Sequence, residues 1–244
     1  MAAGGPVVLI LGSAPNAVSA ADWPRSWFDR IVAINNAWRV RPDWDTLIYP
    51  EDFPEDRRPG QVASNQRLIE AGDFVPAQNA YGGFVHGGAT MAFTAGYWAL
   101  AALRPRILAF MGCDLVYPAR GPTHFYGTGA PDPLRPDVSL RDLGARSARL
   151  ALIAAHEGCA CVNLSRAPSA LLFPQADPGA LRGRLTHPDL DRARYAALRA
   201  REDALGYATP DGRHDDLAPR VDLAAMALLD RDWRDLLVRA TREP

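Results

Sequence analysis

Polar side chains and glycines follow the short apolar runs of this sequence, at the points where the chain leaves each run. Gly12, Ser13 and Asn16 follow the first run, and Asn35 and Asn36 follow the second. Glycine lets a ligand approach backbone N–H groups, while hydroxyl and amide side chains form hydrogen bonds with phosphate and sugar groups. These residues can instead have a purely structural role, because Gly12 suits a tight turn and asparagine tolerates left-handed backbone geometry. The sequence leaves both explanations open.

A second set of candidates lies at residues 86–90 (HGGAT) and at Asp114, which follows a later apolar run. We expect Gly87 and Gly88 to open a helix, with Thr90 in its first turn. The free N–H groups and the dipole of such a helix attract an anion, whereas a plain N-terminal turn is the alternative. Asp114 can either cap a backbone N–H group or accept a hydrogen bond from a ribose hydroxyl.

The long segment 112–138 has no regular pattern and carries aromatic side chains among glycines and prolines. Long loops of this kind are usually functional or disordered, and the aromatic content argues against disorder. His124 is the candidate general base, because an imidazole titrates near neutral pH. Tyr117 and Tyr126 are candidates for hydrogen bonds to a departing phosphate. A surface loop with aromatic anchors is the alternative.

Lysine is absent from the chain, so all 27 basic residues are arginine. A Walker-type phosphate loop and the Schiff-base enzymes, including those that use pyridoxal phosphate, need a lysine and are therefore excluded. The formal net charge of −1 argues against a nucleic-acid partner, because dedicated nucleic-acid binders carry a basic excess. Anions must then be bound by backbone N–H groups, by hydroxyl and amide side chains and by arginines such as Arg39, Arg120 and Arg135.

The remaining histidines and the cysteines indicate no further site. Cys159 and Cys161 occupy alternate positions of an apolar run and so face opposite ways, which indicates buried thiols and no zinc site. His187 and His214 lie in a strongly charged region and are expected to be exposed. We expect no metal site in this chain.

Continuous apolar runs end at the candidate residues and predict buried strands of a parallel sheet. The runs cover residues 7–12, 30–35, 45–49, 106–111 and 159–164. Apolar residues at helical spacing predict helices over 88–103 and 139–157. This alternation predicts an α/β fold with a doubly wound, mostly parallel Rossmann-like sheet and helices on both faces. Ligands of such sheets bind at the carboxyl ends of the strands, which is where the candidate residues lie.

Composition divides the chain into two parts. Residues 1–174 carry the strands and are expected to form a Rossmann-like nucleotide-binding catalytic domain. Residues 175–244 hold 25 charged side chains and two amphipathic stretches, 190–205 and 221–238, which predict a charged helical C-terminal appendage. This appendage either packs on the sheet domain or forms a contact between the copies of a homo-oligomer.

The sequence also predicts where the protein is found. Three cysteines are too few for a disulfide framework, which indicates a reducing compartment. The first apolar run is too short for a signal peptide and has no basic flank. Because no run of about 18 apolar residues occurs, no transmembrane segment is predicted. We therefore expect a cytoplasmic protein.

Taken in order, these motifs resemble the bacterial sialyltransferases that use CMP-sialic acid, in their single-domain Rossmann-like group. Over residues 7–172 the matching segments are VVLILGSAPN, IVAINN, GGATMAFTAGYWALAALRPRILAFMGCDLVY and ARLALIAAHEGCACVNLS. The resemblance implies an inverting glycosyltransferase that needs neither a metal nor a cofactor. Its donor would be a CMP-sugar, and its acceptor a glycan or a small molecule.

The resemblance also implies roles for individual residues. Ser13, Asn16 and Asn35 would contact the phosphates and the cytidine of the nucleotide. The glycine pair 87–88 would hold the same region, and Tyr117 would lie at the leaving phosphate.

This chain departs from the family pattern in two places. Ser13, Ala14 and Asn16 replace the family's Asn, Gly and Ser. Residues 141–143 (RDL) stand where the family places its catalytic histidine, so His124 would have to supply the base from within the long loop. Either the base has moved or the reaction is different.

The same skeleton is similar to the MptE-like pterin pyrophosphokinases, which share the loop after the first strand and the Gly-x-Asp strand end. That resemblance implies diphosphate transfer from ATP, which would need Mg²⁺ and acidic ligands, with Glu51, Asp52 and Asp114 as candidates. A solvated acidic loop is the alternative for the first two. The third alternative for the whole chain is a non-catalytic nucleotide- or glycan-binding module.

Overall fold

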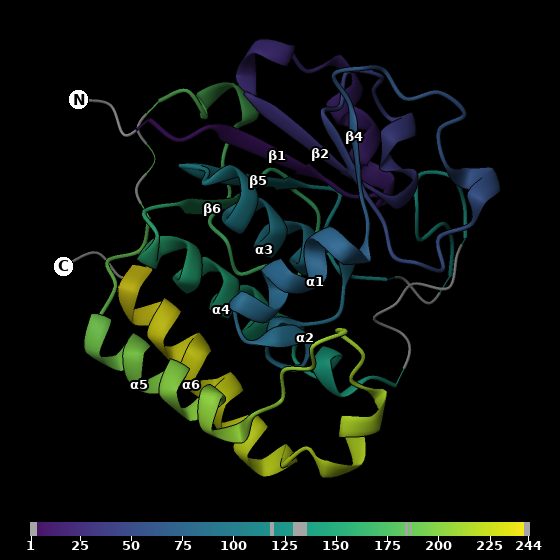
Figure 1. The fold of residues 1–244 in the computed structure, drawn as a ribbon. Coiled ribbons are helices and arrows are strands. Elements are labelled where there is room, and N and C mark those ends of the chain that lie inside the picture. The colour runs from purple at the N-terminus through teal and green to yellow at the C-terminus, as the bar shows by residue number, and fades with distance from the viewer. Residues whose placement is uncertain (1–3, 118–119, 129–135, 184, 186, 242–244) are drawn as a thin grey trace.

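An all-parallel sheet organises the fold, as the computed structural model shows (Figure 1). The structure describes residues 4–117, 120–128, 136–183, 185 and 187–241. The strands are β1 (Val7–Leu11), β2 (Arg30–Ile34), β3 (Thr46–Ile48), β4 (Arg67–Ile69), β5 (Ile107–Met111) and β6 (Ala160–Asn163). They lie in the order β4-β3-β2-β1-β5-β6. The predicted α/β fold with a parallel, Rossmann-like sheet is confirmed.

The strands form because their side chains are almost continuously apolar and are buried on both faces of the sheet. The central strand β1 pairs with β2 on one side and with β5 on the other. Leu11 lies in register with both Ala33 and Met111, so these three strands end close to the same level. The five predicted runs match β1, β2, β3, β5 and β6. The sequence does not predict β4, because the strand has only three residues and begins with an exposed arginine, which is too little to show a pattern.

The helices follow the strands along the chain. The α-helices are α1 (Ala71–Ala80), α2 (Gly83–Gly87), α3 (Met91–Leu103), α4 (Leu143–His156), α5 (Arg192–Leu205) and α6 (Leu223–Thr241). The 3₁₀ helices are η1 (Pro15–Asp22), η2 (Arg25–Trp27), η3 (Asn35–Arg39), η4 (Glu55–Arg57), η6 (Val138–Leu140), η7 (Pro178–Ala180) and η8 (Asp215–Arg220). None of the described helices combines the length and the apolar character needed to span a membrane.

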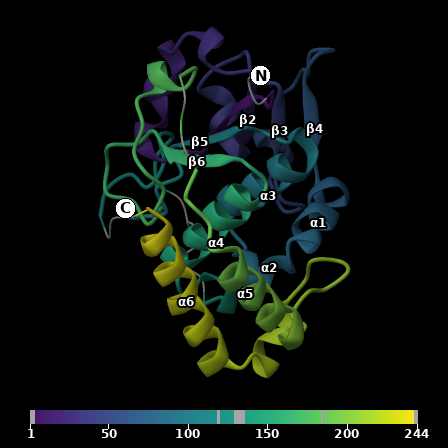
Figure 2. The ribbon, with the colours of Figure 1, turned by 90° about the vertical axis from the view of Figure 1, so that its left-hand side faces the viewer.

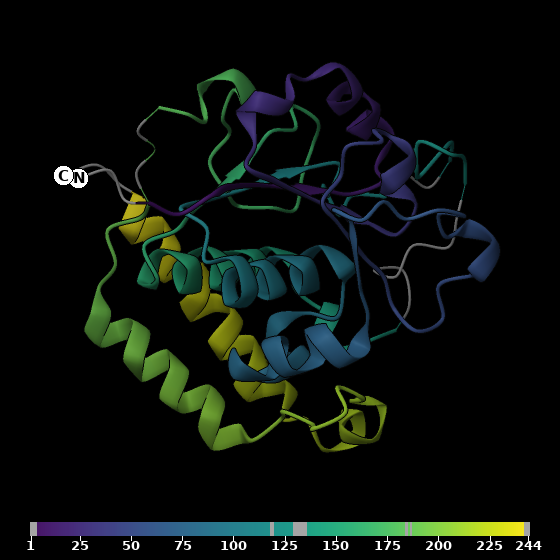
Figure 3. The same cartoon turned by 45° about the horizontal axis from the view of Figure 1, so that its top comes forward.

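The two faces of the sheet are covered differently. Helices α3 and α4 pack against one face, with α1 and α2 outside them, as Figure 3 shows. The other face is covered by short 3₁₀ helices and loops, whereas the sequence predicts helices on both faces. The connections from β1 to β2 and from β2 to β3 contain only 3₁₀ turns, which explains the difference.

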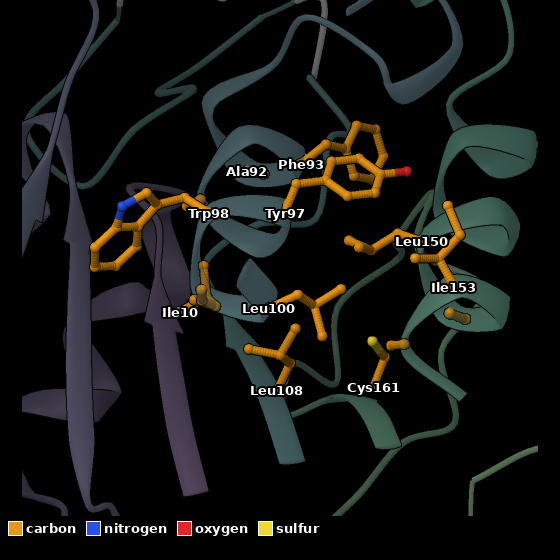
Figure 4. Close-up of a cluster of buried hydrophobic side chains, with 14 of the residues drawn as sticks. Ile10, Ala92, Phe93, Tyr97, Trp98, Leu100, Leu108, Leu150, Ile153 and Cys161 are labelled. Carbon is orange, nitrogen blue, oxygen red and sulfur yellow. The ribbon is translucent and has the colours of Figure 1, made fainter. Parts of the chain in front are cut away.

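Each face of the sheet buries its own apolar cluster. Figure 4 shows Ile10 and Leu108 of the strands facing Leu100 of α3 and Leu150 of α4. Successive side chains of a strand point to opposite faces, so Leu9 belongs to the second cluster, under the 3₁₀ helices. The central strands are therefore held from both sides.

Two buried arginines of α4 hold the C-terminal helices, of which α6 packs on α4 and α5 packs on α6 (Figure 2). Arg149 Nε is 2.7 Å from Glu202 Oε1 of α5, and Arg146 Nη1 is 2.7 Å from Asp230 Oδ1 of α6. The indole Nε1 of Trp233 also donates to Glu202 Oε1. A buried charge is tolerated only when it is paired, so these contacts fix α5 and α6 to the helical layer.

His214 is buried beside Asp137, which corrects the expectation that this histidine is exposed. Its Nε2 lies 3.1 Å from Asp137 Oδ1, and its ring stacks on Phe84. The hydrogen bond to Asp137 raises the pKa of His214. Although burial opposes the change, hydrogen bonds from His214 and Ser139 hold the pKa of Asp137 well below its usual range. The partners are 77 residues apart, so no local pattern indicates the pair.

We expect the His214–Asp137 pair to make the stability of the fold depend on pH. Because the pKa of His214 is raised, its contribution is complete below the ordinary value of 6.5 and is lost as the pH rises through the folded-state value. Because the pKa of Asp137 is lowered, its contribution is present above the ordinary value of 3.8 and is lost as the pH falls through the folded-state value. His214→Asn should therefore flatten the decline in the free energy of unfolding from about pH 6 to about pH 8, measured by urea denaturation. His187→Asn is the matched control, since His187 is exposed, and an unchanged decline in the His214 variant would contradict the assignment.

Candidate functional site

The loops that leave β1 and β5 touch at two glycines. Gly12 N–H donates to the carbonyl oxygen of Met111, and Ala14 N–H donates to that of Gly112. A Cβ atom on Gly12 would overlap the carbonyl oxygen of Gly112. Gly112 has a φ of +70°, and a Cβ atom there would lie 2.7 Å from the Cβ of Ala17. Only glycine allows this approach at both positions.

A cleft of about 560 Å³ opens at the carboxyl ends of β1, β2 and β5. The chain turns in opposite directions after β1 and β5, which is the topological switch point where open parallel sheets bind ligands. Most of the residues predicted from the sequence line this cleft, namely Gly12, Ser13, Asn35, Asn36, Thr90, Asp114, Tyr117, His124 and Tyr126. Asn16, Gly87 and Gly88 do not line it.

Asp114 is buried at the floor of the cleft, and two side chains that do not line the cleft form hydrogen bonds to it. Its Oδ2 accepts hydrogen bonds from Asn16 Nδ2 (2.8 Å) and from Ser165 Oγ (3.0 Å). Its Oδ1 is buried and has no hydrogen-bond partner among the residues that the structure describes. Asn16 therefore positions Asp114 through a hydrogen bond, whereas the resemblance implies a contact between Asn16 and the nucleotide. Ser165, which follows β6, is a partner that the sequence analysis did not identify.

The two asparagines after β2 enter the cleft from the next strand. Asn35 has a φ of +51°, which is the left-handed geometry that asparagine tolerates. Asn35 also lines the cleft, so the structural and the ligand-binding explanations do not exclude each other. Asn36 is almost completely buried at the start of η3. The Oδ1 atoms of both residues are buried and find no hydrogen-bond partner within the described parts of the chain. Two further buried acceptors beside the cleft are thus left without a hydrogen bond among the described residues.

The predicted helix start at Gly87 and Gly88 is wrong. Gly87 ends α2, Gly88 has a φ of +85°, and α3 begins only at Met91. Thr90 is the N-cap of α3, because its Oγ1 accepts a hydrogen bond from the backbone N–H of Phe93 (3.3 Å). The first turn of α3 still reaches the cleft, through Thr90 and Met91. The glycine pair serves packing, since Cβ atoms there would collide with side chains of α1 and α3.

His124 is held in a tight turn above the cleft. His124 and Gly127 exchange backbone hydrogen bonds, and Phe125 N–H donates to the carbonyl oxygen of Ser13 (3.0 Å). The imidazole stacks on Tyr126, with ring centres 4.9 Å apart, and Tyr117 is the next aromatic ring, at 6.4 Å. The candidate base and both candidate tyrosines are therefore brought together, and they are tied to the loop after β1.

Arg57 is the only arginine among the described lining residues, and the sequence analysis did not single it out. It lies on η4, and its carbonyl oxygen accepts a hydrogen bond from Trp38 Nε1. Of the arginines named from the sequence, Arg39 and Arg120 are exposed and do not line the cleft. Arg135 lies outside the described residues. The sequence does not indicate Arg57, because it lies in an irregular acidic loop that has no periodic pattern.

The cleft contains two of the three acidic residues named for Mg²⁺. Asp52 and Asp114 line the cleft, whereas Glu51 is exposed and pairs with Arg213. Across the described ranges no group of three His, Cys, Asp or Glu side chains is arranged to hold a metal ion.

The three cysteines have free thiols and are buried, as predicted for Cys159 and Cys161. Burial raises the pKa of each thiol, Cys113 at the cleft included, so all three stay protonated near neutral pH. None of them is suited to act as a nucleophile.

The fold and this cleft define an α/β protein with a polar cleft at the switch point of a parallel sheet. No family model, curated protein or solved structure matches the chain. The chemistry of the cleft is therefore the guide to the function of this protein.

Gly12→Ala should lower the free energy of unfolding by about 1–3 kcal/mol, because the added methyl group would meet backbone that cannot move aside. Urea denaturation measures the change. Gly60→Ala is the matched control, since Gly60 has open space around it and should stay within about 0.5 kcal/mol of the wild type. Wild-type stability of the Gly12 variant would contradict the close approach of the two loops.

Proposed function

We propose that the chain is a glycosyltransferase that uses a nucleotide-activated sugar, with a CMP-sugar as donor. The observation that carries the proposal is a set of buried acceptors at the floor of the cleft. These are the Oδ1 atoms of Asp114, Asn35 and Asn36, none of which has a hydrogen-bond partner in the described structure. All three residues line the cleft where β2 and β5 end.

Unpartnered acceptors favour a ligand that donates hydrogen bonds. A buried polar atom that lacks a partner costs roughly 1–3 kcal/mol, and a ligand with O–H or N–H groups in the right place recovers this free energy. Asp114 is the decisive member, because both oxygens of a carboxylate accept and neither donates. The ribose hydroxyls and the amino group of cytosine are such donors, whereas an ionised phosphate has none. The floor therefore suits the nucleoside part of the donor.

Groups suited to a phosphate lie on the other walls. The first turn of α3 reaches the cleft at Thr90 and Met91, and the N-terminus of a helix favours negative charge. Arg57 adds a cationic side chain at the wall formed by η4. Both groups bind an anion without lysine, as the composition of the chain requires.

The proposed reaction is a single displacement. His124 removes the proton of an acceptor hydroxyl, and the hydroxyl oxygen forms a bond to the anomeric carbon of the donor sugar. The bond from that carbon to the phosphate oxygen breaks, CMP departs, and the configuration at the carbon is inverted. Tyr117 and Tyr126 donate hydrogen bonds to the departing phosphate and stabilise its developing charge. CMP leaves with this assistance, so the proposal requires no metal.

CMP should bind the protein, and Asp114→Asn should weaken that binding about tenfold or more, because a hydrogen bond to a charged group is lost. Isothermal titration calorimetry measures the affinity, and a thermal-shift screen compares CMP, CDP, ATP with Mg²⁺ and a pterin. Asp203→Asn, on the exposed face of α5, removes the same charge away from the cleft and should bind CMP like the wild type. Stabilisation by ATP with Mg²⁺ but not by CMP would overturn the proposal in favour of diphosphate transfer.

His124→Ala should slow the release of CMP from CMP-sialic acid by roughly 100-fold or more, since general-base catalysis contributes about that much. The affinity for CMP should hardly change, because the proposed role of His124 is in the chemical step. Chromatography of the released nucleotide follows the reaction, with His187→Ala as the control at an exposed histidine. Full activity in the His124 variant would remove this residue from the mechanism. CMP binding with no turnover in the wild type would indicate a binding module.

A further inference from the structure

We propose that Ser165 is a positioning residue for nucleotide binding, because it fixes the carboxylate of Asp114 through Oδ2 and leaves Oδ1 without a partner from the described residues. The proposal rests on the proposed function, in which Asp114 accepts a hydrogen bond from the nucleoside. It gives a role in binding to a side chain that does not line the cleft. The role concerns the affinity for the nucleotide and not the chemical step.

The hydroxyl of Ser165 has three polar neighbours, and their chemistry decides the direction of each hydrogen bond. Asn16 Nδ2 (2.7 Å) and the backbone N–H of Ala167 (3.1 Å) both donate to Oγ. These two donors occupy both lone pairs of the hydroxyl oxygen. The single proton of the hydroxyl is therefore donated to Asp114 Oδ2, which lies 3.0 Å away.

Asp114 Oδ2 accepts two hydrogen bonds, one from Ser165 Oγ and one from Asn16 Nδ2 (2.8 Å). The amide nitrogen of Asn16 has two hydrogens and gives one to each of its two partners. The three side chains thus form a closed ring of hydrogen bonds. Because the two oxygens of a carboxylate are rigidly joined, holding Oδ2 in place also sets the direction of Oδ1. Asp114 and Ser165 are almost completely buried, so bulk water does not compete for these bonds.

The segment after β6 brings Ser165 to Asp114. Strand β6 lies beside β5 in the sheet, where Asn163 pairs with Phe110. The backbone N–H of Ser165 donates to Asn163 Oδ1 (2.9 Å), which fixes the serine at the end of the strand. Farther along, the N–H of Ala170 donates to the carbonyl oxygen of Asp114 (2.8 Å). The segment therefore contacts Asp114 at its backbone as well, and the hydroxyl of Ser165 is its contact with the carboxylate.

Ser165→Ala tests the proposal by removing the donor to Oδ2. We expect KM for CMP-sialic acid and Kd for CMP to rise about tenfold, as for a lost hydrogen bond to a charged group, with kcat for CMP release nearly unchanged. Isothermal titration calorimetry measures Kd. Ser169→Ala is the matched control, since Ser169 lies in the same segment and its hydroxyl donates to the backbone oxygen of Asp114. Wild-type affinity in the Ser165 variant, or an equal loss in both variants, would overturn the proposal.

A double-mutant cycle separates positioning from a general loss of stability. The Asp114→Ala background has no carboxylate to hold, so Ser165→Ala should leave the affinity for CMP nearly unchanged there. An equal loss in both backgrounds would show that Ser165 acts by another route and would overturn the proposal. Ser165→Cys, which places a weaker donor at the same position, takes the place of the alanine variant if that variant does not fold.

The wild-type protein keeps the failure of this proposal apart from the failure of the proposed function. Wild-type protein that binds neither CMP nor CMP-sialic acid would overturn the proposed function. The same cycle, measured on the free energy of unfolding in urea, still shows whether Ser165 and Asp114 are coupled, and independent effects would overturn the contact between them. Wild-type binding of CMP with additive losses in the cycle would overturn the role of Ser165 alone.

Discussion

The approach of the backbone at Gly12 and Gly112 is the constraint on which the rest of the cleft depends. Neither position has room for a Cβ atom, so only glycine allows the loops after β1 and β5 to come into contact at the switch point of the sheet. This contact places Asn16 of the first loop within 2.8 Å of Asp114 of the second. Ser165 closes the arrangement from the end of β6. Three strand ends are thereby joined by one buried carboxyl group, and its second oxygen is buried without a hydrogen-bond partner among the described residues.

The C-terminal helices are connected to this cleft through buried polar contacts. Arg146 of α4 pairs with Asp230 of α6, and its Nε donates to the carbonyl oxygen of Ser139. The hydroxyl of Ser139 accepts from the backbone N–H of Ala89, one residue before the N-cap of α3. Charges inside a protein are tolerated only with such partners, and these contacts link the segment before α3 to α6. The C-terminal part of the chain thus helps to position a wall of the cleft.

The sequence predicts the features that depend on neighbours along the chain and misses those that depend on distant partners. Continuous apolar runs predict β1 and β5, and the rule that ligands bind at strand ends predicts most of the cleft residues. The predicted start of α3 is too early, because Thr90 caps the helix and the glycines before it lie outside α3. The burial of His214 depends on Asp137, and the role of Asn16 depends on Asp114, 98 residues away. Such contacts exist only after the sheet has brought the segments together.

Because the chain has no lysine, the groups of the cleft that suit an anion and those that accept hydrogen bonds lie on different walls. A lysine would offer a mobile point charge that can bind a phosphate in many positions, whereas backbone N–H groups and a helix N-terminus are fixed in direction. The acceptors at the floor, Asp114 and Asn36 among them, are equally fixed, because they are buried and cannot turn toward solvent. Under the proposed function, a ligand with donors at one end and an anion at the other would fit in one orientation. Under the proposed function this orientation places the nucleoside on the sheet and the bond to be broken nearer to His124.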